Sequence, residues 1–159
     1  MTTPHRQLLF VCTGNLCRSP MAEYLLRHHL GPQTDWQIHS AGLAAGNGQA
    51  ASAEAVEVLG ERNIDLTPHR SRSLTHDMVD AAGLIVVMTR AQALDIKRRF
   101  PEAVNRVRLL ASFKSDSRGE DINDPIGGDL ETYRRIRDEI DEALLDLILH
   151  LKKLTTRQP

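Results

Sequence analysis

Two short apolar runs, residues 8–11 and 84–88, constrain the fold of this chain most strongly. Neither contains a polar residue. A strand without polar alternation is typical of the interior of a parallel sheet, where helices cover both faces. The segments between and after the two runs carry apolar residues at helical spacing. Strands that alternate with helices predict an α/β fold with right-handed crossovers.

The other elements follow from periodicity and from helix-start and helix-stop residues. Ser19 and Pro20 match the preference for a hydroxyl cap followed by proline, so the first helix is expected to begin there with Ser19 as its cap. The segment 114–123 is rich in Asp, Ser and Gly and is expected to be a surface loop. The predicted strands are 7–12, 36–40, 84–88 and 107–110, and the predicted helices are 19–30, 52–62, 75–82, 90–100 and 130–154.

Composition and charge exclude several classes of function. The length of 159 residues, with 41% hydrophobic and 26% charged residues, predicts one globular domain over residues 1–159. A formal net charge of -1 provides no overall basic field for nucleic acid. No long apolar stretch follows the polar N-terminus, so we expect a cytoplasmic protein without a signal peptide or membrane contact. Cys12 and Cys17 do not have the spacing of a zinc site, and we expect neither a metal nor a cofactor.

The segment 12–20 reads Cys-Thr-Gly-Asn-Leu-Cys-Arg-Ser-Pro and joins the first strand to the first helix. The backbone N–H groups of such a loop converge on one point, and the helix dipole adds positive charge there, which favours a bound phosphate. The same donors stabilise a thiolate, so we expect the pKa of Cys12 to lie below the value of about 8.5 for free cysteine. Arg18 can bind two phosphate oxygens with its planar guanidinium, and the Ser19 hydroxyl is expected to assist Cys12. This loop predicts metal-free phosphoryl transfer at the carboxyl end of the first strand.

A leaving group departs faster when a placed carboxylic acid protonates it. Asp124 is a candidate, because Pro125 restricts its backbone to extended geometry and fixes where its carboxyl group points. Glu120 and Asp121 lie in the same predicted loop and are alternatives, and a merely solvated role for Asp124 also stays open.

The chain resembles the low-molecular-weight protein-tyrosine phosphatase family, whose signature V-C-x-G-N-x-C-R-S-P is matched without a gap by residues 11–20. The resemblance extends over nearly the whole chain and implies a three-layer sandwich around a four-stranded parallel sheet in the order 2-1-3-4. It implies that Cys12 is the nucleophile and forms a phosphocysteine, that Arg18 binds phosphate and that Asp124 is the general acid. The remaining loop residues expected to hold the phosphate are Thr13, Gly14, Asn15, Leu16, Cys17 and Ser19.

The same resemblance suggests supporting roles for residues around the loop. Asn15 is expected to adopt a left-handed turn, with Ser40 and His69 hydrogen-bonded to it, although a surface position for His69 is the alternative. Cys17 resembles the family's neighbouring thiol, which can trap oxidised Cys12 as a disulfide. The alternative is that Cys17 is a small buried hydrophobic residue.

The pocket wall decides which phosphorylated residue is hydrolysed. By the family resemblance Leu16 and Ile126 line it, and Leu16 resembles the apolar residue of the tyrosine phosphatases, whereas members acting on phosphoarginine carry threonine there. The segment 124–128, Asp-Pro-Ile-Gly-Gly, with the following Tyr133 and Arg134, resembles the protein-arginine phosphatase branch instead. We predict hydrolysis of protein phosphotyrosine, with phosphoarginine as the alternative substrate.

Two other classes of function are weaker. An arsenate reductase of this kind needs further cysteines to pass on a disulfide, and the chain has two. A non-catalytic phosphate-binding module would need neither Cys12 nor Asp124. The expected partner is therefore a phosphorylated protein, bound by a monomer or weak dimer.

Overall fold

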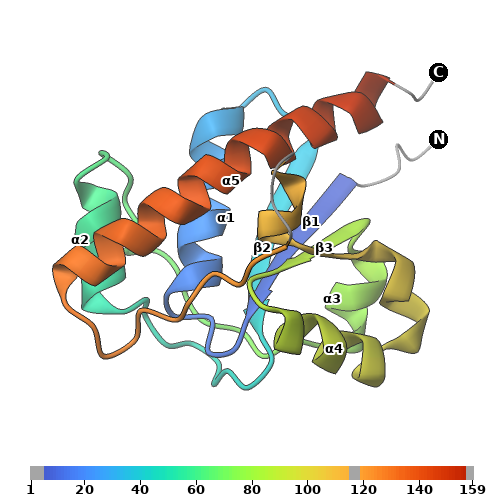
Figure 1. The fold of residues 1–159 in the computed structure, drawn as a ribbon, viewed down its shortest axis with the longest axis horizontal. Coiled ribbons are helices and arrows are strands. Elements are labelled where there is room, and N and C mark those ends of the chain that lie inside the picture. The colour runs from blue at the N-terminus through green and yellow to red at the C-terminus, as the bar shows by residue number, and fades with distance from the viewer. Residues whose placement is uncertain (1–5, 115–118, 157–159) are drawn as a thin grey trace.

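The computed structural model describes residues 6–114 and 119–156, which form a parallel sheet between two layers of helices (Figure 1). The strands lie in the order β2-β1-β3-β4, as the family resemblance implied. Val11 pairs with Ala41 on one side and with Val87 on the other, so the carboxyl end of the first strand lies between two neighbours. The four strands are β1 (Arg6–Cys12), β2 (Trp36–Gly42), β3 (Leu84–Val87) and β4 (Val107–Leu109).

Helices cover both faces of the sheet, and this explains the unbroken apolar runs. Leu8 and Phe10 belong to the core under α1, α2 and α5, whereas Leu9 and Val11 belong to the core under α3 and α4 (Figure 1). Each residue of β1 from Leu8 onward is therefore buried. The helices are α1 (Arg18–Leu30), α2 (Ala53–Gly60), α3 (His76–Ala81), α4 (Arg90–Arg99) and α5 (Leu130–Thr156), with 3-10 turns at Pro101–Arg106 and Leu110–Phe113.

Most predicted boundaries agree with the structure to within two residues, but two details were wrong. Ser19 does not cap α1, because its hydroxyl is turned inward to Cys12 and Asn15. β4 ends at Leu109, and Leu110 begins a 3-10 turn instead of continuing the strand. Residues 119–123 of the predicted loop have no regular structure, and residues 115–118 lie outside the described part.

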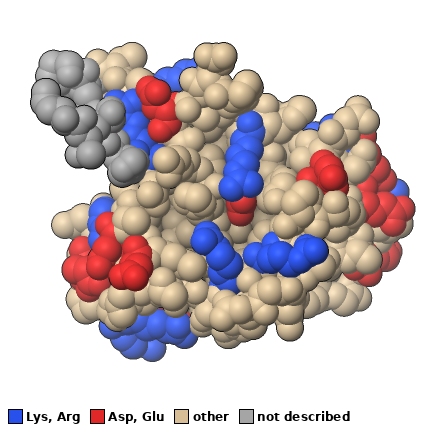
Figure 2. Space-filling model, turned by 180° about the vertical axis from the view of Figure 1, so that it is seen from behind, with Lys and Arg blue, Asp and Glu red and all other residues tan. Residues whose placement is uncertain are grey.

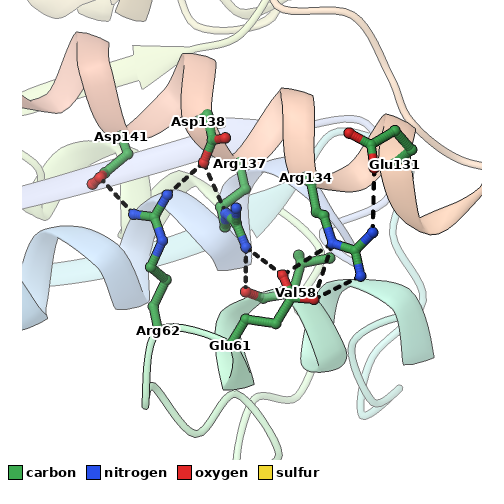
Figure 3. Close-up of polar contacts among 8 residues, drawn as sticks. All are labelled: Val58, Glu61, Arg62, Glu131, Arg134, Arg137, Asp138 and Asp141. Carbon is green, nitrogen blue, oxygen red and sulfur yellow. Dashed lines mark hydrogen bonds and ion pairs between the residues drawn. The ribbon is translucent and has the colours of Figure 1, made fainter.

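A network of charged side chains joins the end of α2 to α5 (Figure 3). Arg137 is buried, with 7% of its surface exposed. It donates to the Glu61 carboxylate at 2.7 Å and to the Val58 carbonyl oxygen at 2.9 Å. Arg134 binds the same carboxylate at 2.8 Å, and Arg62 pairs with two aspartates of α5. The network therefore fixes the carboxyl end of α2 against the longest helix.

Glu61→Gln is expected to lower stability at pH 7 and to have little effect near pH 2. Hydrogen bonds from Arg134 and Arg137 lower the pKa of Glu61 from 4.5 to about 2. Because the pKa is lower in the folded state, the stabilisation is fully present above about pH 4.5 and is lost as the pH falls through about 2. Urea denaturation from pH 7 to pH 2 would measure this, with Glu57→Gln, an exposed change one turn earlier on α2, as the control. A difference between wild type and Glu61→Gln that does not change with pH would contradict the assignment.

The surface carries small groups of charge. On the face drawn in Figure 2, basic and acidic side chains of the described residues form several small groups, in some of which the two signs touch, with uncharged surface between the groups. None of the helices in the described residues is long and apolar enough to span a bilayer.

Candidate active site

The loop between β1 and α1 surrounds the Cys12 thiol with polar groups. Cys12 is 3% exposed, its Sγ lies 2.9 Å from the Ser19 Oγ, and the Asn15 N–H donates to the sulfur at 3.3 Å. β2 comes close to this loop, because a Cβ on Gly42 would lie 2.7 Å from the Thr13 carbonyl oxygen. Glycine at that position lets the neighbouring strand pack against the loop backbone.

Asn15 holds the loop in shape. It has a φ of 56°, the left-handed conformation that was predicted, and it is fully buried. Its amide nitrogen donates to Ser19 Oγ at 2.8 Å and to Ser40 Oγ at 2.9 Å, and its amide oxygen accepts from the Arg72 N–H at 2.9 Å. Both the nitrogen and the oxygen of the Asn15 side-chain amide are hydrogen-bonded. The side chain therefore stabilises a backbone conformation that is costly for most residues.

His69 binds the same residue from the other side. Its Nε2 lies 2.8 Å from the Asn15 carbonyl oxygen, and because a carbonyl only accepts, this nitrogen carries the proton. Burial lowers the pKa of His69, which favours the neutral ring. The predicted contacts of Ser40 and His69 are confirmed, and the surface alternative for His69 is excluded by an exposure of 5%.

Ser40 connects the loop to a buried acid that the sequence analysis missed. Its hydroxyl donates to Glu23, which is 6% exposed and pairs with Arg27 at 2.6 Å. The only sequence signal was the i,i+4 spacing of this acid and arginine on α1. Because the Ser40 proton goes to Glu23, the Ser40 oxygen is left to accept from Asn15.

Arg18 links the loop to the segment before α5. It is 4% exposed, its Nη1 donates to the Ile122 carbonyl oxygen at 2.8 Å, and its Nη2 lies 3.5 Å from the Asp124 carboxylate. The Asp124 side chain is 43% exposed, and its other oxygen accepts from the Ile126 N–H at 3.1 Å. Asp121, one of the alternatives, instead accepts from the Arg90 N–H at the start of α4.

A small cavity of about 30 Å³ lies where these groups meet. Neither Glu120 nor Asp121 lines it, whereas Asp124 does. Three of the loop residues expected to hold the phosphate do not line it: Thr13 is exposed, and Asn15 and Ser19 are buried. The described residues contain no cluster of histidine, cysteine or acidic side chains suited to a metal ion. The lining residues are Cys12, Gly14, Leu16, Cys17, Arg18, Asp124 and Ile126.

The Cys17 thiol, at the end of the loop, lies between two hydroxyl groups. Its Sγ is 3.3 Å from Tyr133 Oη and 3.4 Å from Ser52 Oγ. Burial raises the pKa of Cys17 and raises the pKa of Tyr133 to about 12, so both groups are neutral at pH 7. Cys12 and Cys17 are both free thiols here, and a disulfide between them stays a prediction.

Gln92 is a second residue that the sequence analysis missed. Its amide oxygen accepts from the N–H groups of Met88 and Thr89, both at 3.0 Å, and its nitrogen donates to Thr13 Oγ1 at 3.2 Å. Gln92 therefore ties the end of β3 to the loop after β1. The signal that could have found it is the capping box formed by Thr89 and Gln92 at the start of α4.

The fold and the cavity define a class of protein, the phosphatases with a thiol nucleophile in a strand-to-helix loop. The family model for low molecular weight phosphotyrosine protein phosphatase matches residues 7–157, and the chain belongs to this family of hydrolases.

Similar proteins include protein-arginine-phosphatases, low molecular weight protein-tyrosine-phosphatases and arsenate reductases. A protein-arginine-phosphatase of Geobacillus stearothermophilus is 43% identical over 98% of this chain and 99% of its own. A probable low molecular weight protein-tyrosine-phosphatase, EpsP of Ralstonia solanacearum, is 40% identical over 76% of this chain and 78% of its own. Among solved structures, a cysteine-to-serine mutant of YwlE arginine phosphatase with a phosphorylated active site serine has a TM-score of 0.85. It is 36% identical and covers 92% of this chain and 96% of its own.

Proposed function

We propose that this chain hydrolyses protein phosphotyrosine through a phosphocysteine on Cys12. One observation carries the proposal: a thiol, a guanidinium and a carboxyl group share a cavity with the aliphatic side chains of Leu16 and Ile126. The polar groups suit a phosphate, and the two aliphatic side chains suit the apolar faces of a phenyl ring.

In the first step the Cys12 thiolate attacks phosphorus, and the bond between phosphorus and the tyrosine oxygen breaks. Arg18 holds two of the remaining phosphoryl oxygens and opposes the charge that builds up on them. The loop amides of residues 13–18 supply further donors. Asp124, at the exposed rim, gives its proton to the departing phenolate, so that a neutral tyrosine side chain leaves.

In the second step a water molecule attacks the phosphocysteine. Asp124, now a carboxylate, takes a proton from that water, the bond between sulfur and phosphorus breaks, and inorganic phosphate leaves with the thiolate restored. Ser19, 2.9 Å from the sulfur, stabilises the departing thiolate. The phosphorylated active site serine of the YwlE mutant supports transfer to a side chain at the corresponding place in that protein.

Phosphoarginine is the second candidate substrate, because the 43% identical relative is a protein-arginine-phosphatase. A phosphoarginine side chain brings guanidinium N–H donors into the cavity, and these need acceptors when they lose water. The Asp124 carboxylate at the rim is one acceptor, but Leu16 and Ile126, which form the wall, supply none from their side chains. This mismatch favours phosphotyrosine.

Matched peptides that differ only in phosphotyrosine or phosphoarginine test the choice. We expect kcat/KM for phosphotyrosine to exceed that for phosphoarginine by about tenfold or more, and Leu16→Thr to shift the ratio toward phosphoarginine by about tenfold. Leu149→Thr, the same change at an exposed position of α5, should leave the ratio as in wild type. A wild-type preference for phosphoarginine would overturn the choice of substrate, and hydrolysis of neither peptide would overturn the activity.

We also infer the domain organisation, the oligomeric state and the cellular location of the protein. Residues 1–159 act as one phosphatase domain on phosphorylated proteins, as a monomer or weak dimer, and the cavity already holds a thiol, a guanidinium and a carboxyl group. The two free thiols suit a reducing compartment and support a cytoplasmic location.

A further inference from the structure

A larger hollow adjoins the catalytic cavity and is not needed for the phosphate. Its volume is about 640 Å³, compared with about 30 Å³ for the cavity. It shares Arg18 and Asp124 with the cavity and extends between α4 and the loop after β2, at Leu43 and Ala44. We call this hollow the α4 groove. Figure 1 shows α4 beside the end of the sheet where the phosphate loop lies.

Along one stripe of α4, the side chains that line the groove are apolar in the first part of the helix and basic near its end. Ala91, Leu94 and Arg98 have i, i+3, i+7 spacing and line the groove along one stripe. Leu94 is 61% exposed, so it offers an apolar surface that nothing in the described residues covers. The helix thus places the Arg98 guanidinium beyond an apolar surface formed by Ala91 and Leu94.

The other charged side chains of the groove do not neutralise Arg98. Asp95 pairs with Arg99 at 3.0 Å, and Arg99 also donates to the Leu43 carbonyl oxygen at 3.0 Å. Arg98 is exposed and has no ion pair among the described residues. A ligand that lies in the groove therefore meets one uncompensated positive charge beyond the reacting groups.

We propose that the α4 groove binds the polypeptide that flanks the phosphorylated residue and selects substrates with acidic side chains three to five positions away. The proposal rests on the phosphatase function above, since the phosphate loop fixes one end of the peptide. A phosphorylated residue that fills the small cavity must leave its neighbours outside, and the groove is the hollow that continues from Arg18 and Asp124.

The length of α4 sets the position of the acidic residue. Arg98 lies nine residues after Thr89, which is about 14 Å along the helix at 1.5 Å per residue. An extended peptide advances about 3.3 Å per residue and covers this length in about four residues. A carboxylate about four positions from the phosphoresidue therefore reaches Arg98, while the intervening side chains lie over Leu94.

Four phosphotyrosine peptides test the proposal, with three Glu or three Lys at positions 3–5 on the N-terminal or on the C-terminal side. On one side we expect wild type to prefer Glu to Lys by about threefold in kcat/KM at low salt, the size of an exposed ion pair. Arg98→Glu should invert this ratio, and 0.5 M salt should weaken it in wild type. Leu94→Asn should raise KM for all four peptides and keep the Glu preference.

Lys97→Glu is the matched control, because it makes the same change of charge on α4 at a residue that does not line the groove. It should keep the wild-type ratio. Equal hydrolysis of the Glu and Lys peptides on both sides, or a Glu preference that survives Arg98→Glu, would overturn the groove proposal alone. If wild type hydrolysed neither these peptides nor p-nitrophenyl phosphate, the catalytic proposal would fall as well.

Discussion

Cys12→Ser is expected to reduce the hydrolysis of phosphotyrosine peptides by about 10⁴-fold or more, the loss typical of removing a covalent nucleophile. A serine hydroxyl at this position receives the same N–H from Asn15 and the same contact from Ser19, which lies 2.9 Å from the sulfur. These groups stabilise a thiolate, whose pKa as free cysteine is already about 8.5, but a serine alkoxide is far less accessible. The loop would still bind phosphate without transferring it rapidly.

Two measurements separate this explanation from a folding defect. The thermal midpoint of Cys12→Ser should be close to that of wild type, and inorganic phosphate should still protect the variant against unfolding, because the loop amides and Arg18 remain. Rapid acid quenching of wild type with a phosphotyrosine peptide should trap phosphate on Cys12. Substantial turnover by the folded variant would rule out a covalent intermediate on this residue.

The fold was predictable from the sequence because the strongest signals come from burial. β1 and β3 are central strands covered on both faces, so their apolar runs have one simple explanation. The start of α1 was less predictable. Ser19 has the residue type of a helix cap, yet its hydroxyl lies at the Cys12 sulfur. The contacts within the loop therefore decide its position against the local preference of serine for the N-cap.

The candidate site was predictable only where its residues are adjacent in sequence. The segment 12–18 brings a thiol and a guanidinium together in one loop, whereas Gln92 and Arg72 reach that loop from 79 and 57 residues away. Arg72 contributes its backbone N–H to Asn15, a role that no side-chain pattern can reveal. Such contacts depend on the sheet bringing the ends of β1, β2 and β3 to one edge.

Arg18→Lys is expected to reduce kcat/KM by about 10³-fold although it keeps the positive charge, the loss typical of removing a transition-state donor. Lysine is a point charge and cannot bind two phosphoryl oxygens with the geometry of a planar fork. The variant also loses the 2.8 Å bond to the Ile122 carbonyl oxygen, so the loop that carries Asp124 loses its tether to α1. Because the phosphoryl charge spreads in the transition state, kcat should fall more than KM rises.

Arg106→Lys provides the control for Arg18→Lys. Arg106 also donates to backbone carbonyl oxygens, those of Val79 and Ala82, but it lines neither the cavity nor the α4 groove. Its replacement should lower the melting temperature and leave kcat/KM close to wild type. Near-normal turnover by Arg18→Lys would mean that positive charge alone suffices. In that case the fork geometry that connects phosphate binding to the position of Asp124 would have no catalytic role.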